Sequence, residues 1–190
     1  MNKDKFVFGI IEGDYGAGKT LGLTALGTLT WDSYNKVYAN YKLKNIPNFV
    51  FLPNIREGVL TSLEENSLIL ITELYKYIDK RFCMKKENIK ITHDIQEVRK
   101  GRYDLMGDCF DLTMIDYRFR DIFNFCLRAE KSINEKELSS IFQYRLCRYD
   151  KIYDKVNYSD EVFYLDANDY KDNYDTYERV NKRKLLTAFC

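Results

Sequence analysis

The segment best suited to chemistry lies close to the N-terminus. Residues 13–20 read Gly-Asp-Tyr-Gly-Ala-Gly-Lys-Thr and fit the pattern G-x-x-x-x-G-K-[ST]. In such a loop the backbone N–H groups point inward around a phosphate, which requires residues without bulky side chains. We expect Lys19 to reach the β- and γ-phosphates of a nucleotide and the Thr20 hydroxyl to ligate Mg²⁺. The predicted cofactors are ATP and Mg²⁺, and the predicted binding residues are Gly13, Asp14, Tyr15, Gly16, Ala17, Gly18, Lys19, Thr20 and Leu21.

The flanks of this loop have the pattern that a phosphate site needs. Phe6 to Ile11 is a short apolar run typical of a buried strand, and apolar residues spread over a helix-sized segment from Thr20 to Leu29. A helix that starts at Gly18 would add its partial positive charge to the site. A glycine turn without a ligand is the alternative, and the strand-loop-helix context favours the nucleotide.

A second candidate for chemistry follows the most aliphatic run in the chain. Ser67 to Thr72 predicts a central parallel strand that ends at Glu73. In nucleotide hydrolases a second strand beside the loop strand delivers acidic residues, one near Mg²⁺ and one that orients the attacking water. Glu73 is the catalytic candidate, and the alternative is the first polar residue of a loop. Thr72 stands where an Asp would hold Mg²⁺ through water, so its hydroxyl is a weaker metal candidate that predicts slow turnover.

The remaining pattern must position these residues. Apolar runs predict strands at 37–41, 49–52, 104–110 and 121–127, helices at 55–63 and over much of 74–102, two antiparallel strands at 141–149 and 161–165, and a tail from 169 that is helical near its end. Strands alternating with helices predict an α/β fold with a mostly parallel central sheet flanked by helices and a late antiparallel β-hairpin. The length of 190 residues fits a single domain over 1–190.

Composition excludes several classes of protein. With 31% charged residues, 45% hydrophobic residues and 2 Pro, the chain is neither disordered nor fibrous. It contains no apolar run of membrane-spanning length and no signal-peptide pattern, which predicts a cytoplasmic protein. The cysteines form no C-x-x-C pair and His93 is the only histidine, so a structural zinc is not expected. Buried thiols are the default expectation, although a hyperthermophilic source would reopen the question of disulfides.

Charge is unevenly distributed although the formal net charge is only +1. Residues 76–102 contain nine basic and four acidic side chains, whereas 150–178 contain nine acidic and three basic ones. The first segment is a candidate for sequence-independent contact with DNA phosphates, and a solvated helical face is its alternative. The many Tyr and Phe residues are expected to pack in the core rather than to stack on bases.

The order of several segments resembles a known family. GDYGAGKT, VYANYKL, SLILITELYKYIDKR, RKGRYD, MIDYRFRDIFNF and YDTYERV follow one another as in viral and plasmid ATPases of the FtsK/HerA superfamily, and more narrowly as in zonula occludens toxin-like and archaeal virus DNA-packaging ATPases. The resemblance spans residues 6–180, and its specific motif is the phosphate loop. It implies a RecA-like core with an additional catalytic glutamate, assembly as a homo-oligomeric ring such as a hexamer, and ATP-driven movement of double-stranded DNA. A capsid or portal-like partner in the host cytoplasm or the virion is part of that expectation.

The same resemblance assigns roles to individual residues. Lys19 and Thr20 match the phosphate loop, and Glu73 matches the catalytic glutamate. Arg81 matches an Arg that closes a short tripeptide in relatives, and Arg118 and Arg120 match a D-x-R-x-R pattern, so these three are candidates for an arginine that acts on a neighbour's nucleotide. Their alternative is a set of surface arginines paired with nearby aspartates. The segment 106–110 lacks the Gln that relatives use as a γ-phosphate sensor.

The sequence therefore predicts an ATP-driven DNA translocation or packaging motor, with two rivals. The first rival is a nucleotide-binding assembly subunit with little turnover, which the residue Thr72 and the missing Gln suggest. The second is a small nucleotide or metabolite kinase, which shares the size and the loop but needs an arginine-rich lid that the sequence does not reveal.

Overall fold

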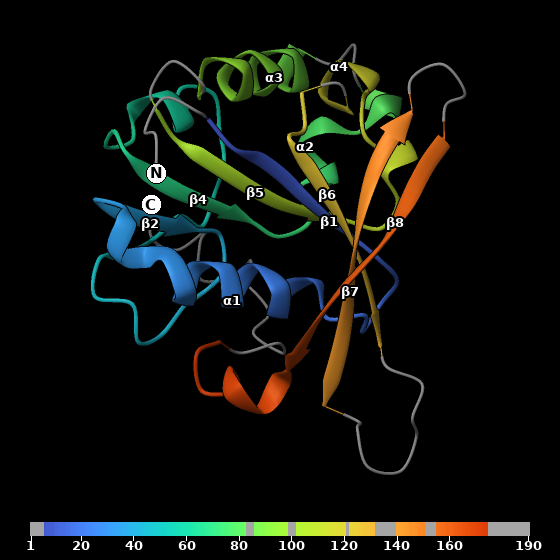
Figure 1. The fold of residues 1–190 in the computed structure, drawn as a ribbon. Helices are drawn as coiled ribbons and strands as arrows, with labels where there is room; N and C mark the ends of the chain where they lie inside the picture. The colour runs from blue at the N-terminus through green and yellow to red at the C-terminus, as the bar shows by residue number, and fades with distance from the viewer. Residues whose placement is uncertain are drawn as a thin grey trace.

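In the computed structural model, one mixed sheet organises the chain, and residues 6–82, 86–98, 102–120, 122–131, 140–150 and 155–174 are described. The described strands lie in the order β3-β2-β4-β5-β1-β6-β7-β8 (Figure 1). They span β1 Phe8–Glu12, β2 Lys36–Ala39, β3 Phe49–Phe51, β4 Ser67–Ile71, β5 Asp104–Cys109, β6 Phe125–Lys131, β7 Ile141–Asp150 and β8 Lys155–Asp166. Strands β1 to β6 pair in parallel, and β7 and β8 continue the sheet in antiparallel fashion.

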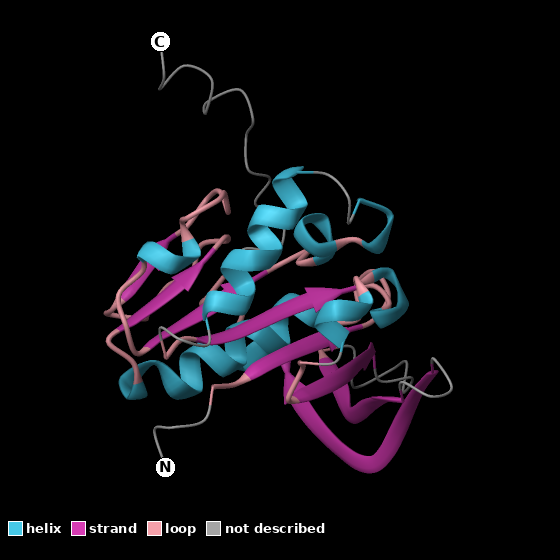
Figure 2. Ribbon diagram, turned by 90° about the horizontal axis from the view of Figure 1, so that it is seen from above, coloured by secondary structure: helices cyan, strands magenta, loops and turns pink. Residues whose placement is uncertain are grey.

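Helices cover both faces of the parallel part (Figures 1 and 2). The described α-helices are α1 Lys19–Thr30, α2 Tyr75–Ile78, α3 Lys86–Val98 and α4 Tyr117–Arg120. Helix α1 packs on one face of the sheet, and α2, α3 and α4 lie on the other. Short 3-10 turns occupy Trp31–Ser33, Leu60–Ser62, Lys80–Phe82, Leu112–Met114 and Ala167–Asp169. No helix in the described ranges combines the length and apolarity that a membrane crossing requires.

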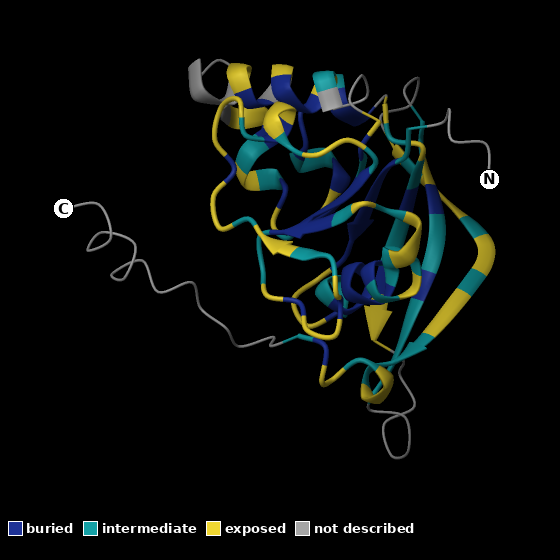
Figure 3. Cartoon of the chain, turned by 90° about the vertical axis from the view of Figure 1, so that its left-hand side faces the viewer, coloured by how far each residue is buried: buried dark blue, intermediate teal, exposed yellow. Residues whose placement is uncertain are grey.

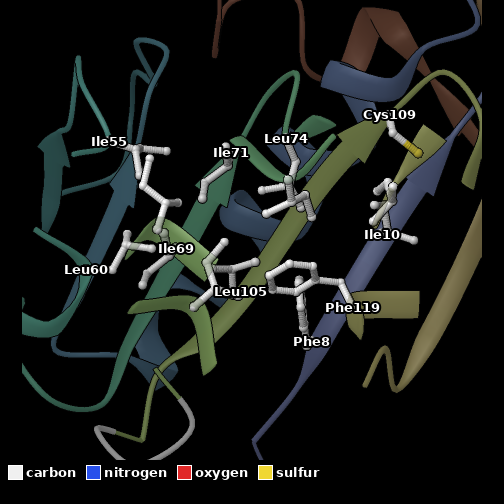
Figure 4. Packing of buried hydrophobic residues seen from close by; sticks show 14 of the residues in the cluster. Phe8, Ile10, Ile55, Leu60, Ile69, Ile71, Leu74, Leu105, Cys109 and Phe119 are labelled. Atoms are coloured by element: carbon white, nitrogen blue, oxygen red, sulfur yellow. The ribbon is translucent and has the colours of Figure 1, made fainter. Parts of the chain in front are cut away.

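Two apolar clusters explain why the strands lie where they do. Side chains alternate between the faces of a strand, so Phe8 and Ile10 join the cluster beneath α3, whereas Ile11 joins the cluster beneath α1. Figure 4 shows the first cluster, in which Ile69 and Leu105 from neighbouring strands meet. The short central strands β1 and β4 are buried along their whole length (Figure 3), as their aliphatic runs predicted.

The predicted fold class is confirmed, and most predicted elements are present. The strand predicted at 104–110 is present as β5, and the late hairpin is longer than predicted. Two local predictions were wrong. Residues 55–63 form only the short turn at Leu60–Ser62, because Gly58 adopts a φ of 76° and interrupts a helix there. Residues 117–120 are helical, which delays strand β6 until Phe125. The tail beyond residue 174 lies outside the described residues.

The placement of the acidic strand also differs from the prediction. Strand β4 does not lie beside the loop strand β1, because β5 is inserted between them and pairs with both. This arrangement places a strand end that the sequence analysis had left without a function next to the phosphate loop.

The expectation of buried thiols is only partly met. Cys109 is a free, buried thiol, whereas Cys126 and Cys147 form a disulfide. The sheet register sets these two residues directly opposite each other on β6 and β7, with their Cα atoms 5.0 Å apart, which is within bonding reach. The other two cysteines, Cys83 and Cys190, lie outside the described residues.

Candidate nucleotide-binding and catalytic site

The phosphate loop connects the end of β1 to the start of α1. Gly13 and Gly18 both have positive φ, at 155° and 90°. A Cβ on Gly13 would lie 2.5 Å from the carbonyl oxygen of Ala129, and one on Gly18 would lie 2.6 Å from the ring of Phe142. Glycine is therefore required at these two positions by both backbone conformation and space.

The N-terminus of α1 is open to an anion. Gly18 is the N-cap residue and makes no side-chain capping bond, and the first turn of the helix contains no acidic residue. The first N–H groups of a helix have no partner within the helix, and together with the helix dipole they attract phosphate. Thr20 lies in this first turn and is partly exposed, whereas Leu21 is buried in the core. The helix begins at Lys19, one residue after the predicted start.

Lys19 is held at the mouth of the loop. Its Nζ donates to the carbonyl oxygens of Gly13, at 2.8 Å, and of Asp14, at 2.9 Å. The ammonium also lies 4.5 Å from the centre of the Phe110 ring, which contacts the exposed ring of Tyr15. Burial lowers the pKa of Lys19, and Asp108 exerts the strongest of the opposing charge attractions. The lysine is thus kept in place by weak backbone acceptors that a phosphate can replace.

Glu73 follows β4 directly and has an unusual backbone. Its φ is 56°, in the left-handed region that residues other than Gly, Asn and Asp rarely adopt. Its N–H donates to Oδ1 of Asp108 at 2.7 Å, and the N–H of Leu74 donates to the Asp108 carbonyl oxygen at 2.9 Å. The carboxylate is half exposed and forms an ion pair with Lys76. Strained backbone held by tertiary contacts is a frequent property of functional positions.

Asp108 is a site residue that the sequence analysis missed. It lies near the end of β5, is only 3% exposed, and links Lys19 to Glu73 by charge and by hydrogen bonding. Desolvation raises its pKa to about 6, while the hydrogen bond from Glu73 and the charge of Lys19 act in the opposite direction. The available signal was an Asp at the carboxyl end of a predicted strand, but that strand had weak periodicity and no known neighbours.

Thr72 also lies at this edge, with its hydroxyl bound to a neighbour. Thr72 Oγ1 donates to Oδ1 of Asn40 at 3.2 Å, the Thr72 N–H donates to the same oxygen at 2.8 Å, and Asn40 returns a bond to the Thr72 carbonyl. The hydroxyl that we expected to hold a Mg²⁺-bound water therefore directs its proton to Asn40.

Residues from the antiparallel strands support the loop from the other side. The hydroxyl of Tyr144 on β7 donates to the carbonyl oxygen of Gly18 at 2.7 Å, and that of Tyr158 on β8 donates to Oε1 of Glu12 at 3.0 Å. Glu12 is the last residue of β1, 1% exposed, and it also accepts from the N–H of Leu112. Burial raises the pKa of Glu12 above its usual value. The sequence offered no signal for these contacts.

The candidate arginines lie in two similar turns. Arg81 and Arg118 each form a two-pronged bond with the aspartate two residues earlier, Asp79 and Asp116, at a shortest distance of 2.6 Å.

The third candidate arginine, Arg120, is buried and forms hydrogen bonds with groups of its own chain. Arg120 is 7% exposed and donates to the carbonyl oxygens of Ile115 and Thr113 and to the hydroxyl of Tyr149. Asp121, an aspartate next to this arginine in the sequence, lies outside the described residues. These bonds join the segment around α4 to β7.

The basic segment 76–102 carries compensated charges at several described positions. Lys76 pairs with Glu73, Arg81 with Asp79, and Lys90 with Glu57. His93 is an exposed residue of α3. At these three described positions, the positive charge that we predicted to contact DNA is paired with a carboxylate.

Comparison with known proteins agrees with this topology. No family model and no curated protein sequence matches the chain. Among solved structures, the N-terminal domain of zonular occludens toxin from Neisseria meningitidis superposes with a TM-score of 0.61 and 17% identity, covering 90% of this chain and 99% of that one. The genome packaging NTPase B204 from Sulfolobus turreted icosahedral virus 2, in complex with ATP-gammaS, superposes with a TM-score of 0.53 and 11% identity, covering 86% of this chain and 100% of that one.

A third structure gives the same result. B204 from Sulfolobus turreted icosahedral virus, a DNA-packaging ATPase, superposes with a TM-score of 0.52 and 13% identity over 86% of this chain. The chain thus has the fold of P-loop NTPases, with the additional strand β5 between the loop strand and the strand that leads to Glu73. The resemblance inferred from the order of its motifs is confirmed at the level of fold.

Proposed function

We propose that this protein is an ATPase that drives translocation or packaging of DNA for a virus or mobile element, working as a homo-oligomeric ring. The observation that carries the proposal is the meeting of three groups at one edge of the sheet. Lys19 follows the phosphate loop after β1, Asp108 lies near the end of β5, and Glu73 follows β4, so these residues lie together at the carboxyl edge of the sheet. The likeness to a viral genome packaging NTPase supports this assignment.

In this proposal each residue of the site has its own role in ATP hydrolysis. The N–H groups of residues 13–20 and the start of α1 bind the β- and γ-phosphates, and Lys19 exchanges its carbonyl acceptors for phosphate oxygens. Glu73 accepts a proton from, or polarises, the attacking water, for which it must leave its ion pair with Lys76. The hydroxyl of Thr20 and the carboxylate oxygens at the site are the hard oxygen ligands that Mg²⁺ prefers. Mg²⁺ would neutralise the charge that develops on the phosphates.

Assembly completes the site in this proposal. An arginine from a neighbouring subunit stabilises charge on the transferred phosphoryl group and raises the rate by about a thousandfold or more. Arg81 and Arg118 are the two candidates that reach the surface, and each is oriented by a buried aspartate. A capsid or portal-like partner and the host cytoplasm as its location belong to the same proposal.

The test is steady-state phosphate release from ATP and Mg²⁺ over a series of protein concentrations, with and without double-stranded DNA. We expect the specific activity to rise with protein concentration and again with DNA. Tight ATP binding with no release at any concentration would favour a non-enzymatic assembly subunit, which the occupied Thr72 hydroxyl makes the main rival. Phosphate transferred to a nucleoside or metabolite would favour a kinase.

A further inference from the structure

An acidic side chain is buried on the strand between the phosphate-loop strand and the strand of Glu73. Asp108 lies opposite Ile11 in the register of β5 with β1. Met106, two residues earlier and so on the same face of β5, packs in the cluster beneath α1. Asp108 therefore faces the side of the sheet that carries α1, whose first turn contains Lys19 and Thr20.

The neighbouring strand lacks an equivalent group. Thr72 follows Ile71, and Ile71 pairs with Gly107, so Thr72 and Asp108 lie side by side at the carboxyl ends of β4 and β5. Thr72 is neutral and its hydroxyl bonds Asn40. Of this pair, Asp108 provides the negative charge, and it does so from the strand that pairs directly with β1.

The surroundings of Asp108 are suited to a cation. The carboxylate is 3% exposed, and it accepts a 2.7 Å bond from the Glu73 N–H and attracts the ammonium of Lys19. A buried carboxylate without enough positive charge is costly, and a divalent cation with its bound water removes that cost. When a phosphate binds Lys19, the positive charge of that ammonium is shared between the phosphate and Asp108, so Asp108 is less fully neutralised.

We propose that Asp108 replaces the missing carboxylate of β4, holding a water of hydrated Mg²⁺ together with Thr20 while it positions Glu73 through the backbone N–H. This inference rests on the ATPase function proposed above. In this inference the acidic residue of the metal site lies on β5 rather than on β4. The same side chain, Asp108, contacts the water around Mg²⁺ and the backbone of the catalytic glutamate.

The test measures Mg²⁺ dependence of nucleotide binding rather than turnover. Binding of ATPγS is followed by titration calorimetry over a range of Mg²⁺ concentrations, for wild type and for Asp108→Asn, which keeps the shape and an acceptor for the Glu73 N–H. We expect the Mg²⁺ concentration for half-maximal tightening to rise about 10- to 100-fold in the variant, the usual effect of losing an outer-shell partner of a metal. Binding in EDTA should be retained.

The matched control makes the same chemical change at the other end of the same strand. Asp104 accepts from the Val7 N–H at 2.7 Å and from the Tyr34 hydroxyl at 2.6 Å, far from the phosphate loop. Asp104→Asn should leave the Mg²⁺ midpoint unchanged. An unchanged midpoint in Asp108→Asn would overturn the inference while leaving the ATPase proposal intact. Wild-type protein that binds no ATPγS would overturn the ATPase proposal itself.

A second measurement uses the wild-type chain and so does not depend on the folding of a variant. Fe²⁺ with ascorbate, added with ATPγS in place of Mg²⁺, cleaves backbone next to the metal, and mass spectrometry locates the cuts. We expect cuts within 107–109 and 18–20 that excess Mg²⁺ suppresses. Cuts within 71–73 that leave 107–109 intact would overturn the inference, because they would place the metal at β4.

Discussion

The parallel and antiparallel parts of the sheet differ in construction and in their contribution to the site. Strands β3, β2, β4, β5 and β1 are three to six residues long, and β1 and β4 are wholly buried. Strand β6 is parallel to β1 but antiparallel to β7, and β6, β7 and β8 have seven to twelve residues with mixed burial. The parallel strands end at one edge, where Lys19, Asp108 and Glu73 meet, whereas the antiparallel strands reach the loop only through side chains such as Tyr144 and Tyr158.

The parallel strands carry the candidate catalytic residues, whereas the antiparallel strands support them. All parallel strands run in the same direction, so the residues that directly follow them lie at the same edge of the sheet. The antiparallel strands support the loop by hydrogen bonds from Tyr144 to the Gly18 carbonyl oxygen and from Tyr158 to the carboxylate of Glu12, which ends β1. A disulfide joins β6 to β7. Changes at Lys19 and Glu73, which follow the parallel strands, should therefore abolish function, and changes in the antiparallel part should reduce affinity or stability.

The largest effect is expected from Lys19→Ala. The variant loses the ammonium that contacts the phosphates, and charge-assisted contacts of this kind contribute about 1.5–3 kcal/mol each. ATP affinity should fall by more than about a hundredfold, and turnover should be lost. Calorimetry measures the binding and a thermal melt without nucleotide verifies the fold. Near-normal affinity would show that the loop does not bind phosphate.

Glu73→Gln should separate binding from chemistry. The amide keeps the size of the side chain but cannot serve as a base, so phosphate release should fall by about 10²- to 10⁴-fold while ATP still binds. Single-turnover kinetics at saturating protein make the measurement. Normal hydrolysis would mean that another residue activates the water, and Glu73 would then be only the turn residue that follows β4.

Reduction of the disulfide should act on stability alone. Cys126 and Cys147 are 21 residues apart, and a cross-link over a loop of this size stabilises a protein by about 3 kcal/mol. Reducing agent should lower the Tm by roughly 5–10 °C, as measured by circular dichroism. A variant with alanine at both positions should melt at the reduced value under either condition. A Tm unaffected by reductant in the wild type would contradict the disulfide.

The buried Glu12 should make stability depend on pH. Because burial raises its pKa, the folded chain binds a proton more tightly than the unfolded chain, and stability falls as the pH rises above the unfolded value of 4.5. Glu12→Gln keeps an acceptor for Leu112 and Tyr158 but removes the charge. The variant should therefore gain Tm relative to wild type at pH 8, and the gain should shrink toward pH 4. A difference that is the same at both values would exclude this charge effect.

The smallest effect is expected from Tyr144→Phe. The variant loses one hydrogen bond to the Gly18 carbonyl, worth about 1 kcal/mol, while its ring still packs in the core. ATP affinity should fall by no more than about tenfold, with no change in the Mg²⁺ requirement. A loss as large as that of Lys19→Ala would mean that the antiparallel part forms the site rather than supports it.

The phosphate loop and Glu73 could be predicted because their signals are local. The loop is eight consecutive residues whose glycines have positive φ, and Glu73 directly follows a strand recognisable from its aliphatic residues. The helical turn at 117–120 could not be predicted in this way, since its four residues carry no helical period and Arg120 is fixed by contacts with β7.

The sequence by itself determined the α/β class, the nucleotide loop and the catalytic candidate, because backbone conformation and hydrophobic period are properties of neighbouring residues. Only the tertiary structure decided the order of the strands, and with it the insertion of β5 and the position of Asp108 beside Lys19 and Glu73. It also decided the bond between Tyr144 and Gly18, 126 residues apart, and the pairing of Cys126 with Cys147. Strand order and register arise from the packing of the whole sheet against its helices, and no single segment contains that information.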